Sequence, residues 1–315
     1  MNQEAPKLSI VVGTYNRLDQ IRRCVESILH ETATPFVLFI TDAGSTDGTV
    51  EYLESIRSDI IKPLLVGKLL GQAKAYNDAF AMVTTPYVCW LSDDNVVVNN
   101  GLDVAVGILE HDQRIGMVGL KTRDVQGPFV KAPYIGGISE IGILNVNQGM
   151  LRTHVLNKVA GFSESFRDYG IDPDLTAKVL FSGYDVVYTK PVSLHHYRNW
   201  STDKSSIEYK KLQEKHDRSR KLYSMKYSQF SRPTLISKLK KTALDAIKRN
   251  AKNPAIVHSK LPVAGNLPRD WFNILGSRYI SLLDPVLFAG KNHHLRQRCP
   301  KRLLPEALPI DPRLS

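Results

Sequence analysis

The chain begins with apolar runs that alternate with amphipathic segments. Residues 8–13 are apolar and rich in β-branched side chains, and residues 17–29 then carry apolar side chains at helical spacing. The same pattern recurs at 36–41 with 47–56, at 61–66 with 72–83, and in the run at 87–92. Strands that alternate with helices of this length predict an α/β fold with a mostly parallel sheet and helices on both faces.

Three of the predicted strands are followed by polar loops, namely residues 14–16, 42–45 and 92–95. The carboxyl ends of parallel strands meet at one edge of a sheet, and folds of this kind bind ligands there. We therefore expect the three loops to gather at a common site.

The pair Asp93-Asp94 directly follows the apolar run 87–91. Neighbouring strand side chains point to opposite faces, so one carboxylate can contact a ligand hydroxyl while the other binds Mg2+ or Mn2+. A turn is the alternative, because Asp-Asp-Asn is also good turn sequence. The sequence has neither Gly-x-Gly-x-x-Gly after the first strand nor Gly-x-x-x-x-Gly-Lys-Ser/Thr, which disfavours a dehydrogenase or a P-loop nucleotidase.

Composition is that of a soluble globular protein, with 315 residues, 43% hydrophobic and 23% charged. The three cysteines are far apart, which fits a reducing compartment without structural zinc. Residues 1–6 show no secretory signal, and no apolar stretch reaches about 18 residues, so we expect no transmembrane helix. These features predict a cytoplasmic protein.

The net charge of +11 is unevenly distributed along the chain. Residues 1–200 carry 18 Lys or Arg against 22 Asp or Glu, whereas residues 201–315 carry 24 against 9. Helical composition also begins after residue 200. We therefore predict a core domain of residues 1–200 and a mainly helical, basic C-terminal extension of residues 201–315.

Four segments of the core, in this order and spacing, resemble the family 2 glycosyltransferases of the GT-A fold. They are Ser9–Arg17, Asp42–Thr49, Gly71–Asn77 and Leu91–Asn95. The resemblance covers roughly residues 7–200. It implies a nucleotide-sugar half at about 7–96 and an acceptor half at about 97–200.

The resemblance assigns five residues to the nucleotide. Asp42 would accept a hydrogen bond from the N3–H of a uracil or thymine ring, with a helix cap as the alternative. Thr14 and Tyr15 would lie around the base and ribose, although Tyr15 could instead pack in the core. Lys74 and Asn77, at i and i+3 on one helix, would line the pocket, unless they are a solvated Lys and a helix-packing Asn.

The carboxylate motif departs from the family's frequent Asp-x-Asp, because the chain has Ser92-Asp93-Asp94. Matched on its last residue, the motif makes Asp94 the metal ligand and Asp93 the ribose contact. The implied cofactor is Mg2+ or Mn2+, which would stabilise the charge of the diphosphate leaving group.

On the acceptor side, two segments resemble the family's Gly-Phe-x-Glu and Glu-Asp-x-Asp-Leu motifs, at residues 161–166 and 169–175. Asp172 falls on the general base of an inverting transfer, and it is also well placed as an N-cap. Asp174 is the second candidate for the base. Ile171 stands where the family has Glu.

Two histidines follow the apolar strand at 185–188. The resemblance implies a histidine here, near the metal and the diphosphate. We assign His195, with His196 as the alternative, because strand alternation lets only one of the pair face the site.

The extension contains a basic helical stretch at 203–250 and interrupted apolar stretches at 270–275 and 279–288. Neither apolar stretch is long enough to span a bilayer. Flanked by Lys and Arg, they could lie on an anionic membrane surface or pack on the core or on a second subunit of a homo-oligomer.

The sequence thus predicts an inverting, metal-dependent glycosyltransferase that uses a nucleotide-diphosphate donor, most simply UDP-linked. The predicted acceptor is a glycan or lipid-linked glycan of cell-surface polysaccharide synthesis, with the enzyme on the inner face of the membrane. The chain has no Gln-x-x-Arg-Trp motif, so it would make single or few additions. Two alternatives stay open: a degenerate, partner-binding protein, suggested by Ser92 and Ile171, and a nucleic-acid-binding protein using the basic tail. The tail lacks interleaved aromatics and the core is acidic, so we expect no nucleic acid.

Overall fold

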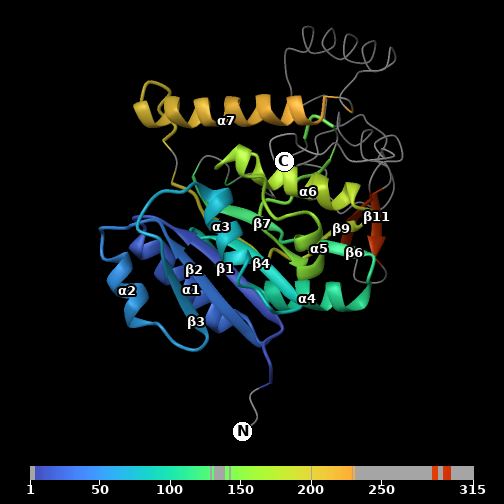
Figure 1. Cartoon of the computed structure of the whole chain (residues 1–315), viewed down its shortest axis with the longest axis horizontal. Helices are drawn as coiled ribbons and strands as arrows, with labels where there is room; N and C mark the ends of the chain where they lie inside the picture. The colour runs from blue at the N-terminus through green and yellow to red at the C-terminus, as the bar shows by residue number, and fades with distance from the viewer. Residues whose placement is uncertain are drawn as a thin grey trace.

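The first four predicted strands form one parallel block, as the sequence predicts. They are β1 (Leu8–Thr14), β2 (Phe36–Asp42), β3 (Ile61–Leu65) and β4 (Tyr87–Ser92), in the order β3-β2-β1-β4. Thr14 pairs with Asp42, and Gly13 pairs with Ser92. The polar loops after β1, β2 and β4 therefore leave the sheet at the same edge (Figure 1).

The structure is a computed structural model that describes residues 4–127, 130, 139–141, 143–199, 201–228, 230, 286–289 and 294–298. The basic stretch after residue 230 and the apolar stretches 270–275 and 279–285 lie outside the described residues.

The second half of the core extends this block with antiparallel pairs. Strand β8 (Gly149–Arg152) runs antiparallel to both β4 and β6 (Ile115–Gly119), and β9 (Asp185–Tyr188) is parallel to β6. The described strands of this sheet have the order β11-β12-β9-β6-β8-β4-β1-β2-β3. The sheet is thus parallel from β3 to β4 and mixed beyond β4.

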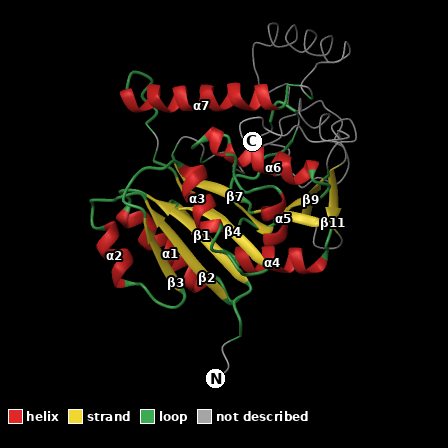
Figure 2. Cartoon of the chain, viewed as in Figure 1, coloured by secondary structure: helices red, strands yellow, loops and turns green. Residues whose placement is uncertain are grey.

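Helices cover both faces of the sheet, because alternate strand residues point to opposite sides (Figure 2). Ile10 and Val12 belong to one buried cluster, whereas Val11 between them belongs to the other. The first face is covered by α1 (Leu18–Glu31), α2 (Thr49–Ser55) and α4 (Gly101–His111). The second face is covered by α3 (Gln72–Phe80), α5 (Thr153–Lys158) and α6 (Ile171–Phe181), with the short 3-10 helix η1 (Glu164–Phe166) before α6.

A small second sheet lies beyond the carboxyl end of β4. It has the order β5-β10-β7, formed by β5 (Asn95–Val97), β10 (Leu194–Tyr197) and β7 (Thr122–Gln126). Its central strand pairs His196 with Asn95 and His195 with Val96. Strand β5 begins directly after Asp94, so this sheet brings the histidine strand to the carboxylate pair.

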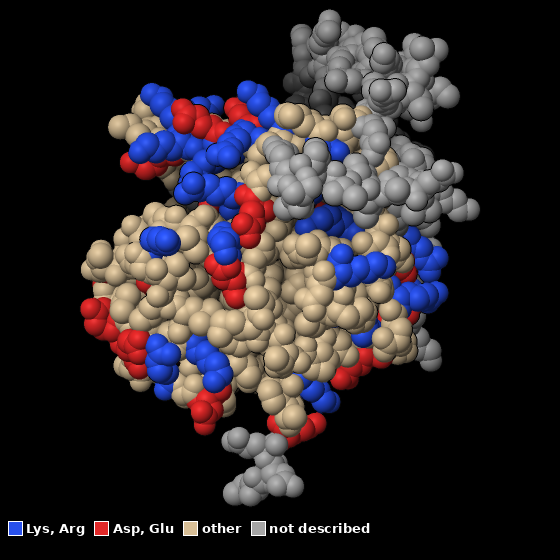
Figure 3. Space-filling view, viewed as in Figure 1, with Lys and Arg blue, Asp and Glu red and all other residues tan. Residues whose placement is uncertain are grey.

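The described residues after 200 pack on the core. Helix α7 (Ile207–Lys226) lies across α6, and Lys and Arg side chains gather along it (Figures 1 and 3). Strands β11 (Val286–Ala289) and β12 (His294–Gln297) continue the main sheet beyond β9. The side chain of Arg296 is buried and forms an ion pair of 3.2 Å with Asp185. The sequence did not predict that a C-terminal hairpin joins the core sheet.

Across the part of the chain that the structure describes, no helix combines the length and apolar character needed to cross a bilayer.

Candidate active site

Asp93 is held at the sheet edge by contacts from β1 and the loop after it. Thr14 Oγ1 donates to Asp93 Oδ2 at 2.8 Å, and Arg17 Nη1 lies 3.0 Å from Asp93 Oδ1. Burial, with the charge of Asp94, raises the pKa of Asp93 to about 6, although Arg17 and Thr14 oppose this shift. Thr14 therefore contacts the carboxylate predicted to bind the ribose and fixes its orientation.

Asp94 is paired with cationic groups on two sides. Arg17 Nη1 lies 3.1 Å from Asp94 Oδ2, and His196 Nε2 lies 3.2 Å from Asp94 Oδ1. Burial by itself would raise the pKa of Asp94, but His196, Arg17 and the hydroxyl of Ser92 hold it well below its ordinary value. Ser92 Oγ donates to Asp94 Oδ1 at 2.7 Å. The residue that departs from Asp-x-Asp thus orients the carboxylate predicted to bind the metal.

The structure corrects the choice between the two histidines. His196, not His195, faces Asp94, because strand β10 alternates and His196 pairs opposite Asn95 at the start of β5. His196 Nδ1 is 2.6 Å from Asp124 Oδ1 on β7. Burial lowers the pKa of His196, but Asp124 and Asp94 together raise it to about 9. His195 lies on the other side of the strand, where burial and Arg123 lower its pKa.

The residues around Asp94 fit a Mg2+ or Mn2+ site. His196 presents Nε2 beside Asp94 Oδ1 while Asp124 holds its other ring nitrogen, as carboxylates do behind histidine ligands. Cations of this kind are bound at nucleotides by one or two protein ligands together with phosphate oxygens. No group of three or more His, Cys, Asp or Glu side chains arranged for a metal occurs among the described residues. Asp94 and His196 are the two side chains that would hold the cation, and His196 would release its Nε2 proton on binding.

Asp42 organises the loop that follows β2. Its Oδ1 accepts hydrogen bonds from the backbone amides of Gly44 at 2.8 Å and Ser45 at 3.0 Å, and the Ser45 hydroxyl contacts Oδ2. Asp42 is 1% exposed, whereas Tyr15 on the neighbouring loop is 41% exposed. The exposure of Tyr15 is not that of a core residue. The contact from Ser45 uses one of the two hydrogen bonds that Oδ2 can accept.

The two residues predicted on α3 have structural partners. Both polar atoms of the Asn77 side chain bond the backbone of Phe162. Nδ2 donates to its carbonyl and Oδ1 accepts from its amide, each at 2.9 Å. Lys74 forms an ion pair with Asp78 on the exposed side of α3. These contacts are those of a helix-packing Asn and a solvated Lys, the alternatives left open by the sequence.

Asp172 lies in the first turn of α6 with a different environment from the carboxylate pair. Asn147 Nδ2 donates to Asp172 Oδ2 at 3.4 Å. Burial raises the pKa of Asp172 to about 8, and the hydrogen bond from Asn147 only partly offsets this. A carboxylate with this pKa is matched to proton transfer near neutral pH.

Tyr76 joins the ends of β1 and β4, and the charges of Asp172 and of the carboxylate pair both act on its hydroxyl. Its hydroxyl donates to the carbonyl of Leu91 at 2.6 Å and accepts from the amide of Gly13 at 3.1 Å, so it joins the ends of β4 and β1. Burial raises the pKa of Tyr76, and the charges of Asp93, Asp172 and Asp94 raise it further. All three carboxylates are therefore within electrostatic reach of a single hydroxyl.

Asp174 and Ile171 are both built into the core. Asp174 is 0% exposed, and Tyr227, Lys226 and Ser163 occupy its carboxylate oxygens. It is therefore not available to an acceptor, unlike Asp172. Ile171 is 3% exposed and packs in the hydrophobic cluster beneath α6. An acidic side chain in this position would be desolvated.

Sequence reasoning missed several residues that shape the site, namely Arg17, Tyr76, Asp124, Asn147 and Arg198. Arg17 is the last residue of the first motif and lies in the loop after β1, and this position could have indicated that it belongs to the site. Arg198 forms an ion pair of 3.3 Å with Asp124, two residues after His196. Asp124 and Asn147 carry no motif, and only the packing of β7 and of the segment before β8 brings them to the site.

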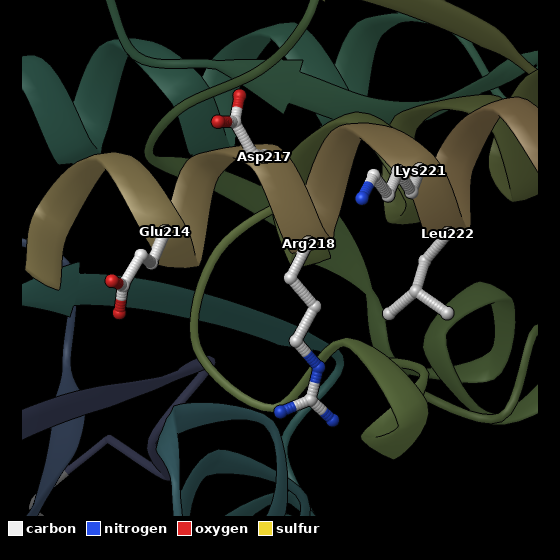
Figure 4. Close-up of a pocket in the computed structure, with 5 residues that line it drawn as sticks. All are labelled: Glu214, Asp217, Arg218, Lys221 and Leu222. Carbon is white, nitrogen blue, oxygen red and sulfur yellow. The ribbon is translucent and has the colours of Figure 1, made fainter.

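A hollow on the surface lies along α7, away from the carboxylates. It is lined by Glu214, Asp217, Arg218, Lys221 and Leu222. Arg218 and Leu222 extend from one side of the helix and Asp217 from the other (Figure 4). The mixed charges and exposure of these residues are those of a solvated helix.

The comparisons with known proteins agree with this architecture. The profile described as "Glycosyl transferase family 2" matches residues 9–166. The chain therefore belongs to glycosyl transferase family 2. It spans between 12% and 35% of the lengths of the curated relatives it matches. One of these is the chondroitin synthase of Escherichia coli, 24% identical over 185 residues, which cover 56% of this chain and 27% of the relative.

Solved structures show the same fold at low sequence identity. S. aureus TarS 1-349 in complex with UDP-GlcNAc has a TM-score of 0.52 and 20% identity, covering 64% of this chain and 61% of that one. The mannosyltransferase PcManGT from Pyrobaculum calidifontis, in complex with GDP-Man and Mn2+, has a TM-score of 0.51 and 20% identity, covering 80% and 78%. The predicted GT-A fold is confirmed.

Proposed function

We propose that this protein is an inverting, metal-dependent glycosyltransferase that moves a sugar from a nucleotide-diphosphate donor to a glycan or lipid-linked glycan. One observation carries the proposal. The site combines a carboxylate pair neutralised by cations, Asp93 and Asp94, with a separate carboxylate, Asp172, whose pKa is raised to about 8. Environments that push carboxylate pKa values apart allow one group to bind charge while another exchanges a proton.

On the donor side, Asp93 would accept a hydrogen bond from a ribose hydroxyl, and Tyr15 and Asp42 would lie at the base. Asp94 and His196 would hold Mg2+ or Mn2+. When bound, the cation would act as a Lewis acid on the diphosphate leaving group. Arg17, which now bridges Asp93 and Asp94, lies within the same pocket and can supply positive charge to the diphosphate.

On the acceptor side, Asp172 would act as the general base. The acceptor oxygen attacks the anomeric carbon from the face opposite the diphosphate, while the bond from that carbon to the diphosphate oxygen breaks. The proton of the acceptor hydroxyl passes to Asp172, so the configuration inverts and charge is balanced. The hydrogen bond from Asn147 holds Asp172 in place for this transfer.

The relatives support a choice of donor and acceptor classes. UDP-GlcNAc is bound by S. aureus TarS and GDP-Man by the Pyrobaculum mannosyltransferase, so a UDP-linked donor is proposed first and a GDP-linked donor second. A chondroitin synthase among the relatives favours polysaccharide synthesis. We place the protein in the cytoplasm, with contact to the membrane surface through residues 201–315.

A non-catalytic, partner-binding role receives less support. The two departures that suggested it have structural reasons, since Ser92 orients Asp94 and Ile171 fills the core. Neither departure removes a group that the proposed chemistry needs.

Release of UDP or GDP from a panel that includes UDP-GlcNAc and GDP-mannose tests the proposal, with and without Mn2+. The parent should release nucleotide only with the cation, and Asp94→Ala and Asp172→Ala should both lose this activity. Thermal stabilisation by each nucleotide sugar identifies the donor independently of turnover. A parent protein that neither binds nor hydrolyses any nucleotide sugar in the presence of Mn2+ would contradict the proposal.

A further inference from the structure

The loop of residues 167–170, between η1 and α6, leads directly into Asp172 and is held from two sides. From α3, the amide of Ala73 donates to the carbonyl of Arg167 at 2.8 Å. From α7, the ring of His216 lies 4.5 Å from the ring of Tyr169, and Lys215 Nζ lies 3.8 Å from Asp168 Oδ2. The loop is thus placed between a helix of the core and a helix beyond residue 200.

Gly170 marks the closest approach of α7 to this loop. Its φ of +85° is left-handed, a conformation that favours glycine. A Cβ atom there would overlap Ser219 Oγ of α7 and lie 2.8 Å from Phe166 Cδ1. Helix α7 therefore packs against the backbone two residues before Asp172.

A buried polar cluster ties the end of α7 to the first turn of α6. Lys226 Nζ lies 2.7 Å from Asp174 Oδ1, and Tyr227 Oη donates to the same oxygen at 2.8 Å. Ser163 Oγ donates to Asp174 Oδ2 at 2.5 Å, and Lys178 Nζ lies 3.9 Å from it. We name Asp174, Lys226, Tyr227 and Ser163 the α6–α7 clamp.

The clamp lies beside a small apolar contact at the C-terminal end of α7, where Leu222, Tyr223 and Tyr227 pack in or against the core cluster that includes Phe181 of α6. Tyr223 is its one buried residue among those described, whereas Ile207 and Met225 are 64% and 67% exposed. A buried ion pair adds little net stability over apolar packing, but it fixes geometry, and losing one partner leaves an uncompensated charge. The placement of α7 on α6 is therefore set by the polar contacts of the clamp together with the aromatic contact at the end of the helix.

We propose that helix α7 is a positioning element of the active site, which sets the first turn of α6 and thereby Asp172 through the pair Lys226–Asp174. This inference rests on the proposed role of Asp172 as general base. It gives residues beyond 200, outside the family-matched segment 9–166, a part in positioning the active site. Asp174 and Lys226 are positioning residues, because they reach the acceptor only through Asp172.

The test compares Lys226→Met with Lys221→Met in the full chain. Lys221 lies on the same helix but is exposed. Lys226→Met should lower nucleotide release from the UDP- or GDP-sugar found active in the panel by about 10- to 100-fold in kcat, since small displacements of a reacting group cost this much. KM for the donor and the affinity for UDP with Mn2+ should stay within about twofold. Lys221→Met should match the parent.

Hydrogen exchange gives a readout independent of turnover. In Lys226→Met, the amide of Asp174, which donates to the carbonyl of Gly170, and the amides of residues 175–177 should exchange faster, while those of β1 and β4 keep their protection. Full activity in Asp172→Asn would contradict the proposed base. If exchange in this segment of Lys226→Met were nevertheless faster, the positioning by α7 would still hold. Unchanged exchange and unchanged kcat in folded Lys226→Met would overturn the inference.

Two further variants keep the inference testable if Lys226→Met does not fold. Tyr227→Phe removes only the hydroxyl that bonds Asp174, and a severalfold loss in kcat with unchanged donor KM is expected. The double variant Asp174→Asn with Lys226→Met removes both charges, so its kcat should exceed that of Lys226→Met. Equal losses of donor affinity and kcat in these variants would overturn the inference. They would show that α7 stabilises the whole fold and does not specifically position Asp172.

Discussion

The proposed donor edge, formed by Thr14, Asp93 and Asp94, and the proposed acceptor side, formed by Asp172, are constructed differently. At the donor edge, Thr14, Asp93 and Asp94 stand at the ends of neighbouring parallel strands, so backbone register fixes them. On the acceptor side, Asp172 depends on a loop, on a first helical turn and on α7. Short motifs suffice where strands align the residues, whereas the proposed base requires contacts from distant parts of the chain.

The two regions also differ in charge. Arg17 and His196 neutralise the donor carboxylates, which keeps the pKa of Asp94 below its ordinary value. Asp172 has one neutral hydrogen-bond donor, so burial dominates and its pKa rises to about 8. The donor edge is thus arranged to hold charge, and the acceptor side to exchange a proton.

The largest effect is expected for Asp172→Asn, which removes the base while leaving the donor edge intact. Nucleotide release should fall by about 100- to 10,000-fold, the range of general base catalysis. UDP affinity in the presence of Mn2+, measured by calorimetry, should be unchanged. Full activity of Asp172→Asn would contradict the role of Asp172 as general base, and with it the proposed difference between the two regions.

Asp94→Ala should break the donor edge instead. Loss of the proposed cation ligand should lower nucleotide release by about 100- to 1,000-fold and abolish the response to Mn2+. His196→Ala should act in the same direction, whereas His195→Ala should resemble the parent in a Mn2+ titration. Stronger loss in His195→Ala than in His196→Ala would contradict the placement of the two rings.

Asp172 also predicts a pH dependence of stability. Its folded pKa of about 8 lies above the unfolded value, so the folded state binds more protons between about pH 4 and pH 8. The free energy of unfolding should therefore fall across this range in the parent relative to Asp172→Asn, and the difference should level off above about pH 8. Urea midpoints at pH 5, 7 and 9 for both proteins measure it; parallel curves would show that Asp172 titrates normally.

The smallest effect is expected for Arg17→Gln. The guanidinium competes with any cation for Asp93 and Asp94, and partly exposed pairs contribute about 0.2–1 kcal/mol. Removing it should tighten Mn2+ binding to the free protein about two- to fivefold, read from thermal-shift titrations. Arg17→Lys keeps the charge and serves as the control. Weaker Mn2+ binding in Arg17→Gln would mean that Arg17 supports the cation site.

Much of the donor half could be predicted because local patterns encode local structure. Apolar runs and helical periodicity specify β1 to β4 and the helices between them, and parallel register then brings Asp93-Asp94 to the edge. The contacts of Lys74 and Asn77 could not be predicted. Spacing of i and i+3 places two residues on one helix face, but it does not determine which residues that face contacts.

The pattern of amino acids alone predicted the α/β fold, the gathering of three polar loops at one edge of the sheet and the position of Asp172 near the start of a helix. Only the tertiary structure decided that His196 faces Asp94, that Arg17 bridges the carboxylate pair, and that α7 packs on α6. The reason is physical: strand and helix periods are properties of neighbouring residues, whereas strand pairing in a second sheet and a buried ion pair between Lys226 and Asp174 join residues far apart in the chain.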